Sequence, residues 1–273
     1  MVIVRLKGGL GNILFQVNLA KYLISKGATV KYDCRLVSSA LLVDLSKINI
    51  QIDRATSLDI YRCIGLVGLH TSMQGKLRKL FRPVNYVTDS SYSFLSNGYY
   101  DGYWQNVGAF GCFLSFSNGV HIDFPLRRQD RGSSSLVIHV RGGDYFSSPN
   151  HVVLSFQYYL NAIGIMMSEN SRIENIVLVT DDILHSKKLI TKICQIYSRI
   201  NVTIVCDSAL DDFTLLANSD NLITANSTFS LWAALLGNSE EQIVIYPMNW
   251  FNDLEKNKTW IETNIKETWL GAQ

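Results

Sequence analysis

The sequence predicts an α/β protein whose strands form parallel sheets covered by helices. Three observations support this class. The chain opens with a strand, a glycine-rich turn, a helix and a second strand; its second half alternates strands and helices regularly; and a polar, charged segment separates the two halves. Strands that alternate with helices of this length are typical of parallel sheets with helices on both faces.

The first half begins as a β-loop-α-β unit. Its expected elements are a strand at 2–6, a glycine-rich turn at 7–11, a helix at 12–25 and a strand at 29–33. Gly27 ends the helix, because glycine readily adopts the backbone conformation that follows a helix. From Cys34 to Phe124 aromatic residues are frequent and periodic segments are few, so no elements are assigned there.

The segment 125–134 is polar and poor in bulky apolar residues, which fits a connection between domains. We place the boundary after residue 128, with an N-terminal domain at 1–128 and a C-terminal domain at 129–273. The elements expected beyond it are strand 135–140, helix 155–168, strand 174–180, helix 184–198, strand 201–206, helix 211–218, strand 221–225, helix 228–237, strand 242–247 and a terminal helix at 258–270.

Composition favours an ordered globular protein, since hydrophobic residues make up 47% of the chain and charged residues 18%. A formal net charge of +2 gives no general reason to expect nucleic acid as a partner. The start shows no signal-peptide pattern, and no apolar run approaches the roughly 18 residues that span a bilayer. The five cysteines lack close pairs and are interpreted as reduced core thiols, so a cytoplasmic location is expected.

The first strand-to-helix junction, Gly8-Gly9-Leu10-Gly11-Asn12, could bind a ligand. Glycines allow close approach of the backbone, and Asn12 could cap the helix while its amide stays near a ligand. The spacing lacks the dinucleotide-binding pattern and the Lys-Ser/Thr ending of a P-loop, so hydride transfer and ATP hydrolysis lose support. The alternative is a tight turn with a helix cap and no further role.

A second junction, His139-Val140-Arg141-Gly142-Gly143-Asp144-Tyr145, follows an apolar strand. Ligands bind at the carboxyl ends of strands in open α/β sheets, and the planar guanidinium of Arg141 suits a phosphate. The two glycines allow a phosphate to approach the backbone. The alternative is a turn in which Arg141 and Asp144 only pair with each other.

Two further junctions carry polar groups. Asp181 and Asp182 could bind a metal, accept hydrogen bonds from a sugar or base, or cap the following helix, and capping is favoured for at least one of them. No further oxygen ligands are evident, so no metal site is assigned. The segment 226–230 places hydroxyls at a helix start, where unpaired N–H groups bind anions such as pyrophosphate. The alternative there is an N-cap with Phe229 and Trp232 in the core.

The segment Lys76–Arg82 places four cations among apolar residues. Most such runs are solvated faces. The sharper alternative is a patch that contacts anionic lipid head groups or a phosphate-bearing acceptor, which would give peripheral contact with a membrane. Elsewhere, Tyr103, Trp104 and Gln105 offer a stacking face with an amide and are the candidates for acceptor binding.

Taken together, the motifs at 8–12 with Phe15 and Gln16, at 139–145 and at 226–230 resemble the α-1,2-fucosyltransferases, glycosyltransferase family 11. The three motifs occur in the family's order and span most of the chain. The resemblance implies a GT-B architecture, in which two Rossmann-like domains face across a cleft. The first domain would bind the acceptor and the second the GDP-sugar.

The activity implied is an inverting transfer of L-fucose from GDP-β-L-fucose to the 2-hydroxyl of a terminal galactoside, in the synthesis of bacterial surface polysaccharide or O-antigen. GDP-fucose would be a co-substrate, and neither a metal nor another cofactor would be required. The acceptor would be a galactoside glycan, lipid-linked in one version of the hypothesis. The enzyme would then work in the cytoplasm, at the inner face of the plasma membrane.

The resemblance also assigns residues. Arg141 would bind the GDP phosphates, with His139 beside it lining the donor site. Apart from the resemblance, Asp144 is the candidate general base because it lies on the same loop as Arg141; the alternative is a carboxylate that braces Arg141 or the loop backbone. Asn12 would lie near the fucose, and Asp211 or Asp212 would meet guanine. The full donor-binding set is Gly9, Gly11, Asn12, Arg141, Asp211, Asp212, Asn226, Ser227, Thr228 and Phe229.

Two positions depart from the family pattern. Ile13 stands where the family usually has Gln, and Gly142 stands where it usually has a second Arg. Loss of that guanidinium removes a fork of hydrogen-bond donors and leaves donor choice open. The alternatives are therefore a related transferase that uses another GDP-sugar, or a non-catalytic protein that binds a nucleotide sugar.

Overall fold

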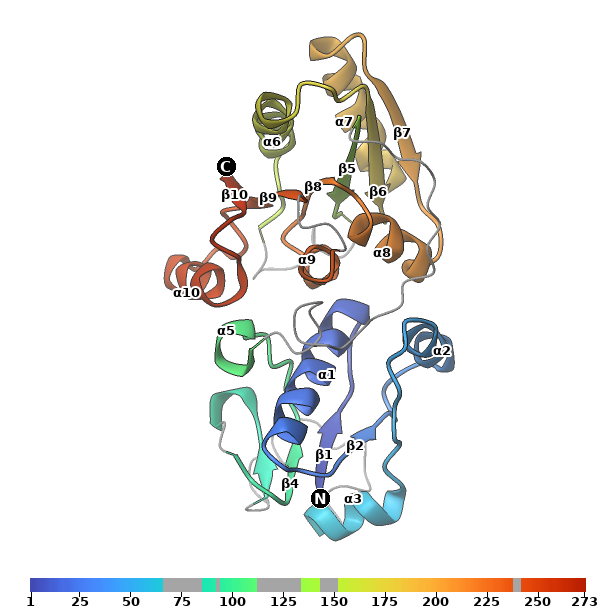
Figure 1. Ribbon diagram of the computed structural model, residues 1–273, viewed down its shortest axis with the longest axis vertical. Coiled ribbons are helices and arrows are strands. Elements are labelled where there is room, and N and C mark those ends of the chain that lie inside the picture. Colours follow the sequence, from blue (N-terminus) through green and yellow to red (C-terminus); the bar gives the residue numbers. More distant parts are fainter. Residues whose placement is uncertain (66–84, 92–93, 112–133, 143–151, 238–241) are drawn as a thin grey trace. The chain divides into compact units, whose positions relative to one another are not determined.

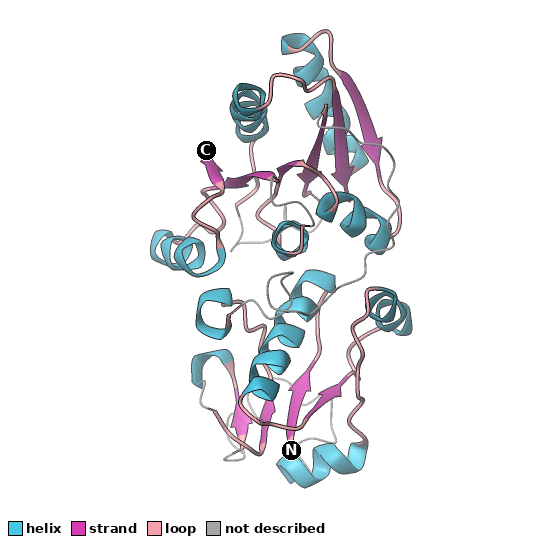
Figure 2. Cartoon of the chain, in the orientation of Figure 1, coloured by secondary structure: helices cyan, strands magenta, loops and turns pink. Residues whose placement is uncertain are grey.

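The computed structural model of the 273-residue chain describes residues 1–65, 85–91, 94–111, 134–142, 152–237 and 242–273. The chain divides into two compact units, Met1–Phe124 and Pro125–Gln273. Each unit has its own sheet with helices packed against it (Figures 1 and 2). The division falls within residues 112–133, outside the described residues, so the boundary after residue 128 stays a prediction.

The first unit is built on a four-stranded parallel sheet of order β2-β1-β4-β3. The β-loop-α-β start is confirmed. Its described elements are β1 (Val2–Arg5), α1 (Leu10–Ser25), β2 (Val30–Asp33), α2 (Ser39–Lys47), α3 (Ser57–Ile64), β3 (Tyr86–Val87), the 3-10 helix η2 (Asp89–Ser91), β4 (Gly98–Tyr100) and α5 (Val107–Phe110). Ile3 and Tyr99 are register partners, and both pack on α3.

The residue that caps α1 is Gly9, whereas the sequence predicted Asn12. Gly8 adopts a φ of +85°, which favours glycine, and Gly9 is the N-cap with no side-chain hydrogen bond. The helix therefore begins two residues earlier than expected, and Asn12 lies within its first turn. The prediction that Asn12 caps this helix is wrong. Its side chain is left to contact another loop.

The second unit is built on a six-stranded parallel sheet of order β10-β9-β8-β5-β6-β7. Every strand and helix expected between residues 135 and 247 is confirmed. The elements are β5 (Ser135–Val140), α6 (Phe156–Glu169), β6 (Asn175–Thr180), α7 (Ile183–Ile196), β7 (Asn201–Val205), α8 (Ala209–Ala217), β8 (Asn221–Ile223), α9 (Thr228–Leu235), β9 (Ile243–Pro247), α10 (Leu254–Asn264) and β10 (Leu270–Ala272).

The terminal helix expected at 258–270 is misplaced. Asp253 caps α10 through a 2.9 Å hydrogen bond from the Lys256 main-chain N–H, so the helix begins at Leu254 and ends at Asn264. Leu270–Ala272 instead pairs with β9 as an edge strand. This pairing is a long-range contact, which the local hydrophobic pattern does not reveal.

The strand order in the second sheet reverses beside β5. The chain builds β6 and then β7 on one side of β5, and returns to place β8, β9 and β10 on the other. The first sheet does the same at β1, with β2 on one side and β4 on the other. In open α/β sheets, ligands bind outside the carboxyl ends of the strands where the order reverses. The loops after β5 and β8, and after β1 and β4, are therefore the places to look for function.

Alternate residues of β5 face opposite layers of the second unit. Leu136, Ile138 and Val140 belong to a buried cluster with residues of α6 and α7. His139 points the other way, where its ring meets Phe229 of α9. Figure 1 shows α6 and α7 on one side of this sheet and α8 and α9 on the other. A polar side chain is thus placed beneath the carboxyl edge, among aromatic rings.

The expectation of five core thiols is wrong for two of them. Cys63 is buried and Cys34 is partly buried, but Cys194 and Cys206 are exposed. Cys112 lies outside the described residues. Cys194 occupies the solvent face of α7, and Cys206 directly follows β7. In the part of the chain that the structure describes, no helix combines the length and the apolar character that crossing a membrane requires.

Ile163→Ala tests the core of the second unit. Ile163 is fully buried between α6 and the sheet, so the truncation should destabilise the protein by about 2–5 kcal/mol through lost burial and a residual cavity. Ile196→Ala is the matched control, since this side chain in α7 is 58% exposed. Thermal unfolding should show a lowered Tm for the first variant only, and equal Tm values would contradict this packing.

Candidate functional site

Polar residues follow three neighbouring strands at the carboxyl edge of the second sheet. Val140 of β5 pairs with Thr180 of β6, so Arg141 and Asp181 are the next residues of the two strands. Ile138 pairs with Ile223 of β8, three residues before Asn226, and the ring of His139 meets Phe229 at the start of α9. The reversal of strand order lies between β5 and β8. The structure therefore brings the motifs near residues 141 and 226 to one edge.

Arg141 forms an ion pair with Asp181, and both side chains are partly exposed. The main-chain N–H of Gly142 donates to the same carboxylate at 3.1 Å. A guanidinium and a main-chain N–H thus converge on one anion. Such charge-assisted donors also suit a phosphate oxygen. The alternative in which Arg141 pairs with Asp144 lies outside the described residues, because Asp144 falls within 143–151.

The neighbouring carboxylate, Asp182, has a different task. It is the N-cap of α7, where its Oδ1 accepts the His185 main-chain N–H at 3.0 Å, so the capping prediction is confirmed for this residue. Its side chain also packs against Gly142. A Cβ at position 142 would lie 2.7 Å from the Asp182 Cβ, too close for an ordinary contact. Glycine at 142 therefore follows from the position of this cap.

His139 is buried directly below the edge. Its ring centroid lies 5.6 Å from that of Phe229, and Phe229 in turn meets Phe213 of α8 at 5.2 Å. Burial, with a smaller effect from the charge of Arg141, lowers the pKa of His139 to about 3. The imidazole is therefore neutral at neutral pH. It supports the Phe229 ring and adds no positive charge for a diphosphate.

The segment 226–230 serves in part as the helix cap that was the alternative to an anion site. The Asn226 side-chain amide is buried and donates to the main-chain oxygens of Val152 at 2.7 Å and Trp250 at 3.3 Å. Ser227 is the N-cap of α9 and accepts the Phe229 main-chain N–H at 3.3 Å. Thr228 and Phe229 stay partly exposed. These two residues, with the first turn of α9, are the parts of the motif that a ligand can reach.

Asp211 and Asp212 lie in the first turn of α8, which follows β7. Ser208 caps this helix and donates its hydroxyl to Asp211 Oδ2 at 2.7 Å. Asp212 accepts the Asp207 main-chain N–H at 3.2 Å, and burial raises the pKa of its carboxyl. Asp211 is exposed and Asp212 partly so. Both carboxylates already have roles at the helix start.

The first sheet carries an ion cluster at its own reversal. Asp101, the residue after β4, accepts Arg5 Nη1 at 2.8 Å, Lys7 Nζ at 2.7 Å and the Tyr86 hydroxyl. Burial alone would raise the pKa of Asp101, but hydrogen bonds from Lys7 and Tyr86, with the charges of Lys7 and Arg5, bring the pKa to about 2. Asp101 is thus a fixed structural anion with little basicity.

A loop following this cluster meets the glycine-rich turn. Gln105 Nε2 donates to Asn12 Oδ1 at 2.7 Å, which joins the loop after β4 to the first turn of α1. Tyr103 is 43% exposed, and Lys7 Nζ lies 4.8 Å from its ring centroid. Gly9 is exposed, whereas Gly11 is buried inside α1. Gln105, Tyr103 and Asn12 are therefore neighbours at the edge of the first sheet.

Trp104 does not offer the expected stacking face. It is 3% exposed and packs between Tyr100 and Phe110, at ring-centroid distances of 5.7 Å and 6.3 Å. The aromatic character of the segment indicated a sugar platform, but a hydrophobic core uses the same residue type. Ile13, one of the departures from the family pattern, is likewise fully buried.

Sequence reasoning missed Lys7, Asp89 and Asp101, and left the role of Asp181 open. The position of Asp101 directly after Tyr99-Tyr100 is the one local signal for an edge residue there. Within the described ranges, no group of three or more His, Cys, Asp or Glu side chains is placed to hold a metal ion. The segments Lys76–Arg82 and 143–151, with Asp144, lie outside those ranges.

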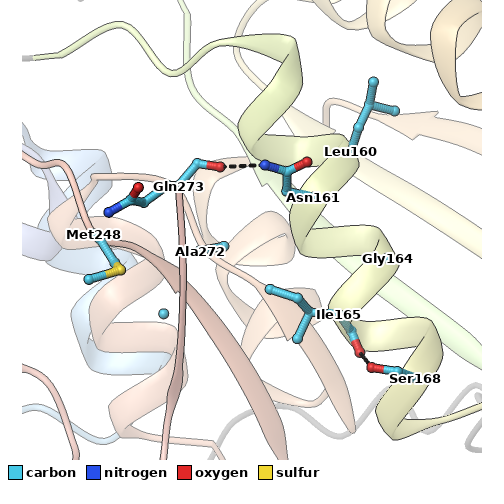
Figure 3. A pocket seen from close by; sticks show the side chains of 9 residues that line it. Leu160, Asn161, Gly164, Ile165, Ser168, Met248, Ala272 and Gln273 are labelled. Atoms are coloured by element: carbon cyan, nitrogen blue, oxygen red, sulfur yellow. Dashed lines mark hydrogen bonds between the residues drawn. The ribbon is translucent and has the colours of Figure 1, made fainter.

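A separate hollow of about 570 Å³ lies between α6 and the end of the chain (Figure 3). Figure 3 shows Asn161 donating to the main-chain oxygen of Gln273, a bond of 2.8 Å. The lining contains no charged side chain and none of the predicted site residues: Leu160, Asn161, Gly164, Ile165, Ser168, Met248, Gly271, Ala272 and Gln273. A diphosphate would find no cation there, so the chemistry points to the strand edges.

Comparisons with known proteins agree with this geometry. Residues 83–273 match the family model for Glycosyl transferase family 11. The O-antigen biosynthesis glycosyltransferase WbnK of Escherichia coli is 26% identical, over 95% of this chain and 98% of that protein. An alpha-1,2-colitosyltransferase of Escherichia coli is 27% identical, over 94% of each.

Among solved structures, the Escherichia coli heptosyltransferase WaaC with ADP matches 99% of this chain and 92% of that chain, with a TM-score of 0.50 and 11% identity. At this identity the likeness concerns the fold. It confirms the predicted α/β class of GT-B type, with two Rossmann-like units.

The buried His139 should make stability depend on pH. Its folded pKa of about 3 lies below the ordinary 6.5, so its contribution is complete above pH 6.5 and is lost as pH falls toward 3, when the unfolded chain alone binds the proton. One such group changes the free energy of unfolding by about 1.4 kcal/mol per pH unit. Denaturant unfolding at several pH values gives the free energy of unfolding as a function of pH. For His139→Phe this free energy should fall less steeply between pH 6.5 and 3 than for wild type, and an unchanged pH dependence would contradict the burial.

Proposed function

The chain belongs to glycosyl transferase family 11, and on that premise we propose that it moves L-fucose from GDP-β-L-fucose to the 2-hydroxyl of a terminal galactoside. The product would carry an α-1,2 linkage. The observation that supports this most is the juxtaposition of Arg141 with the start of α9, on the two strands that flank the reversal in the second sheet. A guanidinium and a helix N-terminus together suit a diphosphate.

The proposed reaction is a single displacement. The acceptor oxygen attacks the anomeric carbon of fucose, the bond from that carbon to the diphosphate oxygen breaks, and GDP leaves with the electron pair. The hydroxyl proton passes to a base. Arg141 and the first-turn N–H groups of α9 stabilise the charge that develops on the diphosphate, as preorganised donors do. In this mechanism no metal is required.

Asp144 is the proposed base, because hydrogen bonds and cations make two other carboxylates poor candidates. It follows Arg141 by three residues, although it lies outside the described residues. Asp101 is a poor candidate, because its hydrogen bonds and cationic neighbours hold its pKa near 2. Asp33 is similarly engaged by Arg35 and by Tyr99, which hold its pKa below the ordinary range despite burial.

The donor nucleoside would lie along the same edge. Guanine carries N–H donors, and a carboxylate of Asp211 or Asp212 at the start of α8 is the proposed acceptor. Thr228 and Phe229 would contact the nucleotide, while Asn226 and Ser227 hold the loop that presents them. In the first unit, Gly9, Gly11 and Asn12 would lie on the donor side, with Asn12 near the fucose.

The acceptor galactoside would bind to the first unit. Tyr103 has an exposed ring, and Gln105 on the same loop adds amide groups through its hydrogen bond to Asn12. Sugar rings stack on aromatic faces and hydrogen-bond to amides, so this pair suits a pyranose. Because one relative acts in O-antigen biosynthesis, we place the reaction in surface-polysaccharide assembly. A lipid-linked acceptor and contact of Lys76–Arg82 with the cytoplasmic face of a membrane belong to the same proposal.

A second donor is favoured by one comparison, the similarity to an alpha-1,2-colitosyltransferase. Colitose is fucose without its 3-hydroxyl. A site that hydrogen-bonds this hydroxyl would reject colitose by about 10⁴-fold, whereas an apolar site would distinguish the two sugars weakly. Competition between GDP-fucose and GDP-colitose in one reaction separates the two donors.

Arg141→Ala should lower kcat/KM by about 10²–10³ or more while the protein stays folded, because a donor aimed at the leaving diphosphate is lost. Release of GDP from GDP-fucose with a galactoside acceptor measures this. Arg172→Ala is the matched control, since Arg172 is an exposed cation of the same unit. Near-normal turnover of Arg141→Ala would refute its assigned role.

Incubation of the wild-type protein with GDP-fucose and a lactose-type acceptor should yield GDP and a fucosylated product. Linkage analysis should identify an α-1,2 bond, and excess EDTA should leave the rate unchanged. Loss of activity with EDTA would overturn the metal-free mechanism. Donor binding without turnover, with every acceptor and GDP-sugar offered, would instead favour the non-catalytic protein.

A further inference from the structure

We propose that Asp89 is a positioning residue for acceptor binding, and that it acts by holding the backbone of the loop at residues 102–105. This inference rests on the proposed function, because that loop carries Tyr103 and Gln105. Asp89 begins the 3-10 helix η2, thirteen or more residues before the loop in the chain. Neither the family motifs nor the donor site includes it.

The carboxylate of Asp89 binds two successive main-chain N–H groups of the loop. Its Oδ2 accepts from Tyr103 at 3.0 Å, and its Oδ1 accepts from Trp104 at 2.7 Å. The anion therefore bridges adjacent peptide groups. Bonds to a charged acceptor are stronger than those between neutral groups. This bridge fixes the direction in which the Tyr103 side chain leaves the backbone.

Two features show that the loop is shaped around this carboxylate. A Cβ on Gly102 would lie 2.5 Å from both oxygens of Asp89, so only glycine leaves the carboxylate its place. Trp104 adopts a φ of +57°, a conformation that a bulky residue rarely adopts. The buried Trp104 ring and the Asp89 bridge together offset the cost of that backbone conformation.

The loop delivers its two remaining side chains to the edge of the first sheet. Gln105 Nε2 reaches Asn12 Oδ1 at 2.7 Å, and the Lys7 ammonium lies over one face of the Tyr103 ring, which leaves the other face for a sugar. Gln16 adds a 3.3 Å hydrogen bond to the main-chain oxygen of Gly102. The loop is thus fixed at its start and its end. Asp89 supplies the contact in the middle, next to the proposed sugar-stacking ring.

The consequence is a division of labour that kinetics can resolve. Without the Asp89 carboxylate, Tyr103 would lose its fixed direction, while the residues that bind the diphosphate belong to the other unit and keep their contacts. Acceptor binding should therefore weaken and GDP binding should not. A general loss of folding would instead affect both substrates together.

The test compares wild type, Asp89→Asn and Asp89→Ala at saturating GDP-fucose with the galactoside acceptor varied. Asn retains one acceptor oxygen and Ala retains none, so KM for the acceptor should rise about 10-fold or more for Ala and by less for Asn. The Kd for GDP, which carries no fucose, should stay within twofold of wild type. Asp53→Asn, an exposed carboxylate of the same unit, is the matched control.

The outcomes are distinct. An unchanged acceptor KM in Asp89→Ala, with an active wild type, overturns the role of Asp89 and leaves the proposed function standing. A wild type that transfers no fucose overturns the proposed function, and the inference with it. If Asp89→Ala fails to fold, Asp89→Asn decides: a rise in acceptor KM with an unchanged GDP Kd supports the role, and parallel losses in both contradict it.

Discussion

The register between β5 and β6 is the constraint on which the second unit's site depends. It places Asp181 level with Arg141, and the Asp181 carboxylate then accepts both the guanidinium and the Gly142 main-chain N–H. A slip of one residue would send Arg141 to the other face of the sheet. The buried strands prevent such a slip, because Ile138 and Val140 would lose their place in the core. Hydrophobic packing therefore fixes the positions of the polar residues at this edge.

Both units have a reversal of strand order, but the charged groups beside it differ. In each, the strand order reverses beside the first strand, and an ion pair lies at the end of that strand. In the first unit one carboxylate is fully engaged, because Arg5, Lys7 and the Tyr86 hydroxyl all donate to Asp101. In the second, one cation faces one carboxylate and both remain partly exposed. The first cluster is therefore a scaffold, whereas the proposed function assigns the Arg141 guanidinium of the second to the donor diphosphate.

Sequence reasoning predicted the second unit well, because its strands are buried runs separated by helices of regular length. It predicted the residues at the strand ends for the same reason. It failed for β10, because pairing with a distant strand determines the structure there. It also failed where the same residue type occurs both in binding sites and in cores. Trp104 suits a sugar platform or a core equally well, and its burial depends on Tyr100 and Phe110. The roles of Asp89 and Asp101 arise from pairings that no local pattern carries.

The contact between Gly142 and Asp182 couples two loops that belong to neighbouring strands. Any larger residue at 142 requires the cap of α7 to move, and a different cap at 182 would release space above β5. Across relatives these two positions should therefore vary together, so that an arginine after Arg141 is accompanied by a smaller or displaced residue at the start of α7. Replacing Gly142 by a larger residue would therefore require a change at position 182 as well.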